Sequence, residues 1–301
     1  MKVNIVTVRS GWILQKIAER TKEGNTNKDV NIRVSHEPDL EADINYYVDL
    51  QNCYRGGKTK CDIAYFTHAH EDSKDWVNNL LTQTNAYSNL DGIVSMNGRY
   101  TKMLRKLGYP SKKLITITPG ETSKDFPLKK IIIGIVSRGG WEGYGQGFLD
   151  EFFRTYKVDN FHFKFLGSGW EQGLGPVAKA HNISMDFYSD EEEYPQFYKS
   201  FYHSIDYLLI PGMWTAGPMS MQEALSCGVP VIGADVGFVG YEFIADYIFS
   251  KGNKKQLSSI LASLEEPMIG RRAQVKDMSW EKYCNDVVAF CKKIYNDKFS
   301  K

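Results

Sequence analysis

The sequence predicts an α/β protein built from two doubly wound domains with a cleft between them. Short apolar runs alternate with amphipathic stretches along the chain, and the alternation starts afresh after a polar, turn-rich segment at residues 119–128. Such alternation is typical of βαβ units, which build parallel sheets. The length of 301 residues gives room for two domains of this kind. We therefore expect a first domain over residues 1–127, a second over 128–278 and a terminal helix over 279–301.

The expected elements follow one another as βαβ units require. In the first domain, the sequence predicts strands at residues 3–8, 30–34, 44–48, 63–66, 92–96 and 114–118, and helices at 13–20 and 100–107. In the second, it predicts strands at residues 131–136, 161–166, 207–210 and 230–233, and helices at 148–156, 195–202 and 220–226. Ligands of open α/β sheets bind beyond the carboxyl ends of the strands, so functional residues are expected in the loops that follow the strands.

Composition excludes several classes of protein. Apolar residues make up 42% and charged residues 24% of the chain, as in an ordinary globular protein rather than a disordered or coiled-coil one. The 37 basic and 36 acidic side chains leave a net charge of +1, which gives no general attraction to nucleic acid or membrane. The start lacks the apolar core of a signal peptide, no apolar run reaches the roughly 18 residues that span a bilayer, and the five cysteines form no C-x-x-C pair. These features predict a cytoplasmic protein without a transmembrane segment.

A glycine-rich loop over residues 137–147 follows directly after the strand expected at 131–136. Its glycines let the backbone approach an anion closely, and Arg138 adds a guanidinium fork that suits a phosphate. Such a loop either binds an anion or is an ordinary solvated turn. The sequence alone leaves both interpretations open.

A second candidate segment, residues 212–231, follows an apolar strand and enters a helix near Ser220. The N–H groups of a first helical turn carry partial positive charge and would hold a diphosphate. Glu223 lies one turn further on, where a carboxylate can accept the hydroxyls of a ribose. The alternative for Glu223 is a solvated residue near the positive end of a helix.

The stretch at 217–232, GPMSMQEALSCGVPVI, closely resembles the donor-site signature of the GT-B, family-4-type retaining glycosyltransferases, also called glycosyl transferases group 1. Segments around it extend the resemblance, namely 165–169, 190–193, 206–208, 235–237 and 242–244. The resemblance is strong over residues 131–295 and weaker before them, although residues 94–120 look like the family's bridge.

The resemblance implies the GT-B fold, in which two Rossmann-like domains face a central cleft and the terminal helix, beginning at Trp280, crosses back to the first domain. It implies a nucleotide-sugar donor, UDP- or GDP-linked, with retention of the sugar's configuration and no cofactor. With the loop positions above, it predicts these donor-binding residues: Gly11, Arg138, Gly139, Gly167, Ser168, Tyr188, Thr215, Gly217, Pro218, Met219, Ser220 and Glu223. The expected catalytic residues are Arg138 and His68.

Two positions depart from the family's pattern. The family pairs two glutamates eight positions apart, but the residue eight positions before Glu223 is Thr215. The family also places a lysine five residues after its loop arginine, where this chain has Gly143. In the family, that glutamate touches the transferred sugar and that lysine helps to neutralise the leaving diphosphate. Because Thr215 holds no negative charge beside a developing oxocarbenium ion, we expect an active enzyme with an altered donor preference.

Loops of the first domain are expected to form the acceptor side. Gly11 could let the backbone approach the donor sugar, and Arg9 could reach a phosphate. His68, after the strand at 63–66, could contact the acceptor hydroxyl or the donor sugar, or it could simply cap the next helix. His68 and His70 have the spacing of two zinc ligands, but no third ligand is evident, so we expect no metal.

A basic loop at residues 55–60 lies near Tyr46, Tyr47 and Tyr54 in the sequence. Tyrosines that stack on bases or sugars, next to cations that meet phosphates, could recognise a nucleic acid or a phosphorylated acceptor. The same composition is also that of a solvated hairpin tip.

The leading functional prediction is a sugar transferase in which an acceptor hydroxyl attacks a nucleotide sugar. Arg138 and the helix amides near Ser220 would stabilise the leaving diphosphate without a metal, and the chain has no Asp-x-Asp motif. The alternative is a catalytically weak or inactive nucleotide-binding subunit. A dehydrogenase fits less well, because Arg9-Ser10-Gly11 is no G-x-G-x-x-G motif. The acceptor stays open between a glycan, a lipid-linked sugar, a small molecule and a modified nucleic-acid base.

Overall fold

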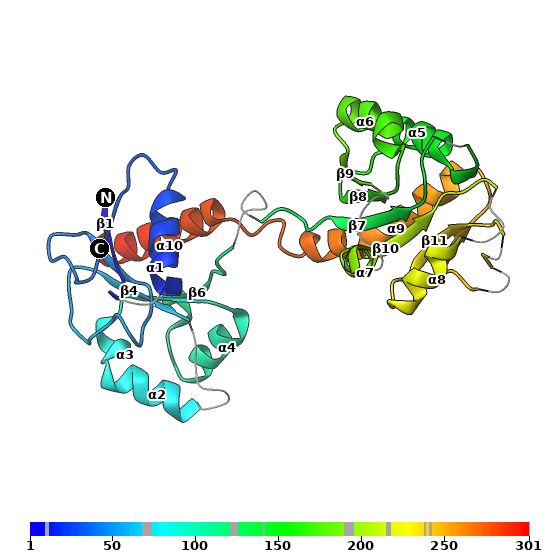
Figure 1. Ribbon diagram of the computed structural model, residues 1–301. Helices are drawn as coiled ribbons and strands as arrows, with labels where there is room; N and C mark the ends of the chain where they lie inside the picture. Colours follow the sequence, from blue (N-terminus) through cyan, green and yellow to red (C-terminus); the bar gives the residue numbers. More distant parts are fainter. Residues whose placement is uncertain are drawn as a thin grey trace. The chain divides into compact units, whose positions relative to one another are not determined.

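The computed structural model describes residues 1–9, 12–67, 74–120, 126–140, 142–189, 196–214, 218–237, 239–240 and 243–300. The chain divides into two compact units (Figure 1). Unit 1 comprises Met1–Phe126 and Ala273–Lys301, and unit 2 comprises Pro127–Arg272. Residues 273–278, which the sequence assigns to the second domain, therefore group with the terminal helix in unit 1.

Unit 1 is built on one parallel sheet, which in its described part has the strand order β2-β1-β3-β4-β5-β6. The strands are β1 (Lys2–Val6), β2 (Asn31–Ser35), β3 (Ile44–Tyr47), β4 (Asp62–Phe66), β5 (Gly92–Ser95) and β6 (Leu114–Thr116). Every residue of β3 and β4 is buried. Strands that are covered on both faces read as nearly continuous apolar runs, which is why the sequence pattern locates them.

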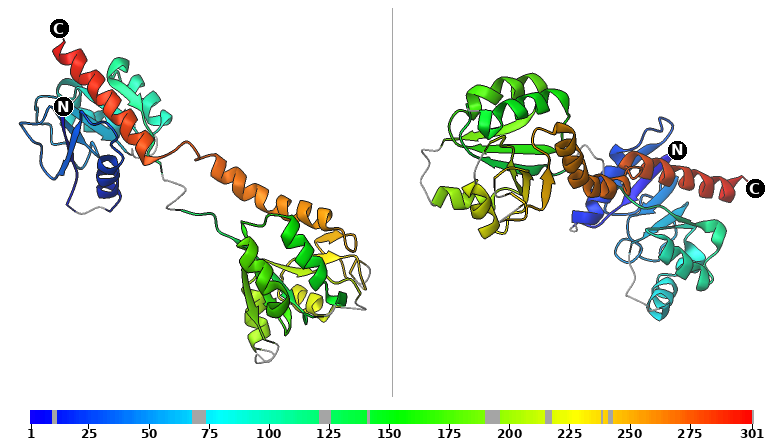
Figure 2. Two further views of the ribbon diagram at one scale, coloured as in Figure 1. Left: turned by 90° about the horizontal axis from the view of Figure 1, so that it is seen from above. Right: turned by 90° about the vertical axis from the view of Figure 1, so that its right-hand side faces the viewer.

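Helices cover both faces of this sheet. They are α1 (Trp12–Glu23), α2 (Lys74–Gln83), α3 (Ala86–Asn89), α4 (Gly98–Lys106), the short 3-10 helix η1 (Ser111–Lys113) and the terminal helix α10 (Trp280–Phe299). Ser279 caps α10 by accepting a hydrogen bond from the N–H of Lys282 at 3.1 Å. The helix packs on the sheet, where the hydroxyls of Tyr46 and Tyr283 are 3.1 Å apart, and it lies beside α1 (Figure 2).

Unit 2 repeats this plan with the strand order β12-β11-β10-β7-β8-β9 in its described part. The strands are β7 (Ile131–Val136), β8 (Phe161–Leu166), β9 (Ser184–Tyr188), β10 (Tyr207–Ile210), β11 (Val231–Ala234) and β12 (Tyr247–Phe249). The helices are η2 (Glu142–Tyr144), α5 (Gln146–Thr155), α6 (Trp170–His181), α7 (Gln196–His203), α8 (Met219–Ser226) and α9 (Lys254–Ala273).

Two apolar clusters hold unit 2 together, one on each face of its sheet. Phe152 of α5, Trp170 of α6 and Leu261 of α9 belong to the first cluster. Phe201 of α7 and Met221 of α8 belong to the second. Burial of large aromatic and aliphatic side chains on both faces holds these helices in place against the sheet.

In each unit the order of the strands reverses direction at the first strand. β1 lies between β2 and β3, and β7 lies between β8 and β10. The loops that leave two such neighbouring strands go to opposite sides, so a crevice opens at the carboxyl edge between them. Each unit therefore has one position where a ligand site is expected.

The prediction of an α/β chain with two doubly wound, Rossmann-like sheets is confirmed. The sequence pattern did not locate α2, α6, α9 or the edge strands β9 and β12. The central cleft and the crossing of α10 between domains stay predictions. Within the ranges that the structure describes, every helix is too short or too polar to span a bilayer.

Candidate functional site

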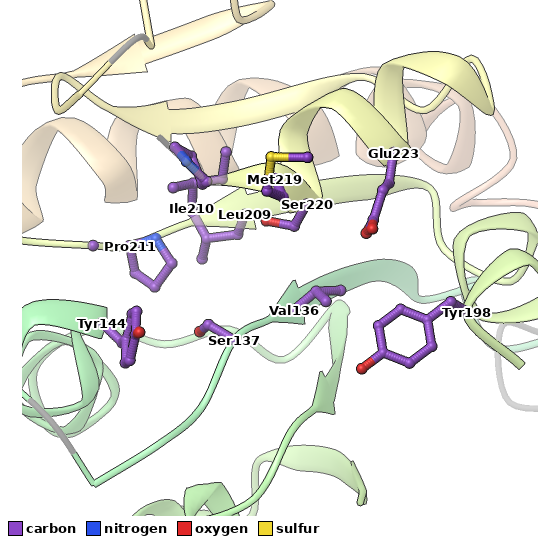
Figure 3. Close-up of a pocket in the computed structure, with 12 residues that line it drawn as sticks. Val136, Ser137, Tyr144, Tyr198, Leu209, Ile210, Pro211, Met219, Ser220 and Glu223 are labelled. Atoms are coloured by element: carbon purple, nitrogen blue, oxygen red, sulfur yellow. The ribbon is translucent and has the colours of Figure 1, made fainter. Parts of the chain in front are cut away.

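A cavity of about 330 Å³ opens at the reversal point of the unit-2 sheet (Figure 3). It lies between the ends of β7 and β10 and the start of α8. The lining residues are Val136, Ser137, Tyr144, Tyr198, Leu209, Ile210, Pro211, Gly212, Pro218, Met219, Ser220 and Glu223. The volume is that of a site for a small molecule, since such pockets measure about 300–1,000 Å³.

Glu223 is held in place by a tyrosine from a neighbouring helix. The hydroxyl of Tyr202, on α7, donates to Oε2 of Glu223 at 2.5 Å. Burial, and then the hydrogen bond to Glu223, raise the pKa of Tyr202 well above its ordinary value, so the hydroxyl stays protonated and keeps donating. Glu223 is half-buried in the cavity wall and is no freely solvated helix residue. No described residue bonds to its second oxygen, which is left for a ligand hydroxyl.

The first turn of α8 forms the wall beside Glu223. Pro218 precedes the helix and provides no side-chain cap. Met219 and Ser220 follow as the first helical residues, and both line the cavity. The first N–H groups of a helix lack intrahelical acceptors and carry partial positive charge, so this wall suits a phosphate group.

Ser137 lies opposite α8, directly after β7. Its carbonyl oxygen accepts a hydrogen bond from Nε1 of Trp170 at 2.5 Å, which fixes the backbone. Its hydroxyl oxygen is buried and has no partner among the described residues. Because Ser137 lines the cavity, a ligand atom there could supply the missing hydrogen bond.

The glycine-rich loop after β7 interlocks with the turn after β8. The N–H of Gly139 donates to the carbonyl of Ser168 at 2.7 Å. Gly167 has a φ of 129°, and a Cβ at this position would lie 2.2 Å from the carbonyl oxygen of Ser137. Both glycines are therefore required for the two backbones to meet. Arg138 extends from this junction with an exposed side chain.

Tyr188 ends β9, next to the same turn. Its carbonyl accepts from the N–H of Gly167 at 2.9 Å. Its ring lies 5.6 Å from that of Phe197 and 5.9 Å from that of Phe201, measured between centroids. Tyr188 therefore stands at the carboxyl edge, two strands away from the cavity.

Gly143, where the family places a lysine, has a structural task of its own. Its carbonyl oxygen accepts from the N–H of Met213 at 2.8 Å and from that of Trp214 at 3.2 Å. These bonds tie the loop after β7 to the loop after β10. The cavity walls are thereby joined through the backbone at this position.

The structure brings some of the predicted site residues together and leaves others apart. Pro218, Met219, Ser220 and Glu223 line one cavity. Five more predicted residues lie along the adjacent carboxyl edge of the sheet but do not line the cavity: Arg138, Gly139, Gly167, Ser168 and Tyr188. The remaining ones, Gly11, His68, Thr215 and Gly217, lie outside the described residues.

Sequence reasoning missed Tyr202 and the two cavity-lining tyrosines, Tyr144 and Tyr198. A tyrosine on an amphipathic helix carries the same pattern as a core residue, so no signal marks Tyr202. Ser137 could have been found, because it is the first polar residue after a buried strand at the carboxyl edge. Among the described residues, no group of three or more His, Cys, Asp or Glu side chains is arranged to hold a metal ion.

Two Rossmann-like sheets in one chain, the second with a helix N-terminus and a held carboxylate lining one cavity, are the arrangement that the resemblance to GT-B glycosyltransferases predicts. Residues 121–278 match the family model of the glycosyl transferases group 1. The chain therefore belongs to this family and is a glycosyltransferase.

Solved structures similar to this chain include several glycosyltransferases. The apo form of the lipopolysaccharide outer core galactosyltransferase WaaB has 14% identity and a TM-score of 0.40, with 100% of this chain and 99% of that chain covered. HepE of Anabaena in complex with UDP-glucose has 12% identity and a TM-score of 0.39, with both chains covered fully. Sucrose-phosphate synthase from Thermosynechococcus elongatus has 12% identity and a TM-score of 0.40, with 99% and 100% covered. No curated protein sequence matches.

Proposed function

We propose that the protein transfers a sugar from a nucleotide-sugar donor, UDP- or GDP-linked, to an acceptor hydroxyl, with retention of configuration and without a metal ion or cofactor. The donor's ribose and diphosphate bind in the unit-2 cavity. The observation that carries the proposal is that Glu223, held by Tyr202, and the first turn of α8 line the same cavity. A carboxylate for ribose hydroxyls and N–H groups for phosphates thus stand side by side.

The chemistry follows from where negative charge develops. As the sugar leaves the nucleotide, the diphosphate gains charge, and the amides of Met219 and Ser220 stabilise it. Arg138, which follows the cavity-lining Ser137, adds its guanidinium. Positive groups that are already in place cost no reorganisation at the moment of reaction. His68, by its place after β4, contacts the acceptor hydroxyl or the donor sugar.

The donor sugar differs from that of relatives with a glutamate at position 215. Thr215 leaves space and removes a carboxylate beside the sugar, so the transferred sugar carries groups that fill that space. The second candidate, an inactive nucleotide-binding subunit, is motivated by Thr215 and Gly143. We favour an active enzyme because Arg138, Ser220 and Glu223 are all retained.

Titration calorimetry with UDP and GDP tests the donor site. We expect Glu223→Gln to weaken binding of the preferred nucleotide about tenfold, since charge-assisted hydrogen bonds contribute about 1.5–3 kcal/mol. The matched control is Glu266→Gln, an exposed glutamate on α9. Equal affinity in the wild type and a folded Glu223→Gln variant would remove Glu223 from the site.

A panel of nucleotide sugars, assayed with and without EDTA, tests the reaction itself. We expect transfer or slow donor hydrolysis that persists in EDTA, with NMR of the product showing the donor's anomeric configuration. Thr215→Glu should shift the preferred donor sugar. Nucleotide binding with neither transfer nor hydrolysis over a broad panel would favour the inactive subunit.

A further inference from the structure

Unit 1 contains a second cavity, of about 360 Å³, at the carboxyl edge of its own sheet. It lies at the reversal point, where the loops after β1 and β3 diverge. The loop after β2 closes it with residues 36–38. The cavity is therefore the unit-1 counterpart of the site in unit 2.

A buried hydroxyl without a protein partner lines this cavity. Thr7 is the first residue after β1, and its backbone is fixed by an N–H bond to the carbonyl of Ser35 at 2.9 Å. Nδ1 of His36 lies 3.2 Å from the carbonyl oxygen of Thr7, to which it donates. The Thr7 residue is only 2% exposed, and its Oγ1 has no partner within the described ranges. A ligand atom in the cavity is the group that could satisfy it.

Cations gather at the mouth of the same cavity. Arg9 comes from the loop after β1, and Arg55 comes from the loop after β3. Both side chains are exposed, and neither forms an ion pair with a residue that the structure describes. The imidazole of His36 also lines the cavity, and Glu37 is the one carboxylate among the lining residues. The guanidinium groups thus outnumber the carboxylates in the cavity wall.

Two further carboxylates in this region already have partners. Asp62 accepts from the hydroxyl of Tyr47 at 3.0 Å and from the hydroxyl of Thr59 at 2.7 Å. Asp49 accepts from the backbone N–H of Asn52 at 2.9 Å. Both carboxylates are buried beneath the lining. Their hydrogen bonds satisfy these carboxylate oxygens inside the protein.

The one cysteine in the lining is no nucleophile. Burial raises the pKa of the Cys53 thiol to about 11. At neutral pH it stays protonated, and the thiolate is the reactive form. The cavity is therefore suited to bind a ligand rather than to form a covalent bond with it.

We propose that this cavity binds the phosphate group of a phosphorylated acceptor. The inference rests on the proposed function, in which unit 1 supplies the acceptor side. Two guanidinium forks, those of Arg9 and Arg55, match the two negative charges of a phosphate monoester and bind its oxygens in a bidentate manner. The hydroxyl of Thr7 donates to a third oxygen. Two basic segments that are separate in the sequence thus serve one ligand.

The test uses the full chain with a saturating concentration of UDP or GDP, whichever binds more tightly, so that the diphosphate site of unit 2 is occupied. Calorimetry then measures binding of inorganic phosphate, glucose 6-phosphate, glucuronate and glucose. We expect glucose 6-phosphate to bind, with an affinity that falls as salt is added, and glucose not to bind. Arg9→Gln and Arg55→Gln should each weaken binding at least tenfold, and Thr7→Val a few-fold. The matched control is Arg33→Gln, because Arg33 is an exposed arginine of the same unit and its Nη1 lies 3.8 Å from a carboxylate oxygen of Asp39.

UDP affinity separates this proposal from the donor-site proposal. If UDP binds normally in every variant while phosphate binding is the same with and without Arg9 and Arg55, the acceptor inference is overturned and the donor site stands. Binding of glucuronate as tight as that of glucose 6-phosphate would likewise overturn the assignment to phosphate. If neither UDP nor GDP binds the wild type while binding of glucose 6-phosphate still depends on both arginines, the proposed donor function fails and the phosphate site is supported.

Discussion

Thr7 and Ser137 occupy the same position in two different sheets. Each is the first residue after the first strand of its unit, β1 or β7, and each lines the cavity at the reversal point of that sheet. Both hydroxyl oxygens are buried without a partner among the described residues. An unpaired buried hydroxyl costs about 1–3 kcal/mol, a cost that a polar ligand group in each cavity could offset, as both proposals assume.

The hydrogen bond from Tyr202 to Glu223 predicts that Tyr202 acts as a positioning residue. Tyr202→Phe keeps the ring in the core but releases one oxygen of the carboxylate. We expect nucleotide affinity to fall about threefold to tenfold, since the carboxylate then loses its fixed orientation. Calorimetry with the preferred nucleotide measures this.

A tyrosine of unit 1 provides the control for that change. Tyr87 belongs to unit 1, and its hydroxyl donates to the carbonyl oxygen of Leu107 and to the side-chain oxygen of Asn78. Tyr87→Phe should therefore leave nucleotide affinity within a factor of about two while costing similar stability. If both variants bind nucleotide like the wild type, Tyr202 does not position Glu223 for the ligand.

Arg138 is predicted to act on the departing diphosphate. Arg138→Ala should lower kcat about 100-fold or more and change the KM for the donor only a few-fold, because the interaction strengthens as charge develops. Arg138→Lys should recover little, since a point charge replaces a fork. Steady-state kinetics measures both constants. The control is Arg154→Ala, an exposed arginine paired with Asp150 on α5. A kcat for Arg138→Ala within a factor of two of the wild type would refute the electrostatic role.

The junction between the loops after β7 and β8 predicts a contrast between two glycines of unit 2. Gly167→Ala places a methyl group 2.2 Å from the carbonyl oxygen of Ser137 at a φ of 129°. We expect a Tm lower by roughly 5 °C or more and reduced nucleotide affinity. Gly270→Ala, in α9, meets no atom within 4 Å and should stabilise the helix by about 0.5–1 kcal/mol. Thermal unfolding of both variants checks this, and equal Tm values would show that the loops do not need Gly167.

The sequence predicted every strand of the unit-1 sheet, including its edges β2 and β6, but only the four central strands of the unit-2 sheet. β7 and β10 are apolar runs between helices, and their pattern is unambiguous. β9 is partly exposed along its length, and its sequence, SMDFY, shows neither the apolar run of a buried strand nor the alternation of a half-buried one. α6 contains a proline at 176 and two glycines, which are breaking signals in a sequence but are tolerated in a helix held by Trp170 and Leu174.

The site was predictable where it follows from a local segment and unpredictable where it depends on tertiary contacts. Glu223 could be assigned because it lies in the segment at 217–232 that resembles the family's donor-site signature, whereas its place one turn into a helix left a solvated residue as the alternative. Tyr202 precedes it by 21 residues and reaches it only through the packing of α7 beside α8. In unit 1, Arg9 and Arg55 come from different loops, and only the folded sheet brings them to one cavity.

The unpaired hydroxyl of Ser137 predicts that removing it raises the stability of the free protein and lowers its affinity for nucleotide. Ser137→Ala removes a buried oxygen that has no protein partner, while the carbonyl that accepts from Trp170 stays in place. Without ligand, we expect the free energy of unfolding to rise by about 1–3 kcal/mol, because the desolvation cost of the hydroxyl disappears. With saturating nucleotide, this gain in stability should vanish, since the ligand loses a hydrogen bond and its affinity falls several-fold.

Ser204→Ala is the control for this change. Ser204 Oγ donates to the carbonyl of Phe201 at 2.8 Å, and loss of this bond should lower stability with and without nucleotide. Thermal unfolding with and without the preferred nucleotide measures this, and an equal gain for Ser137→Ala in both conditions would show that this hydroxyl does not contact the nucleotide.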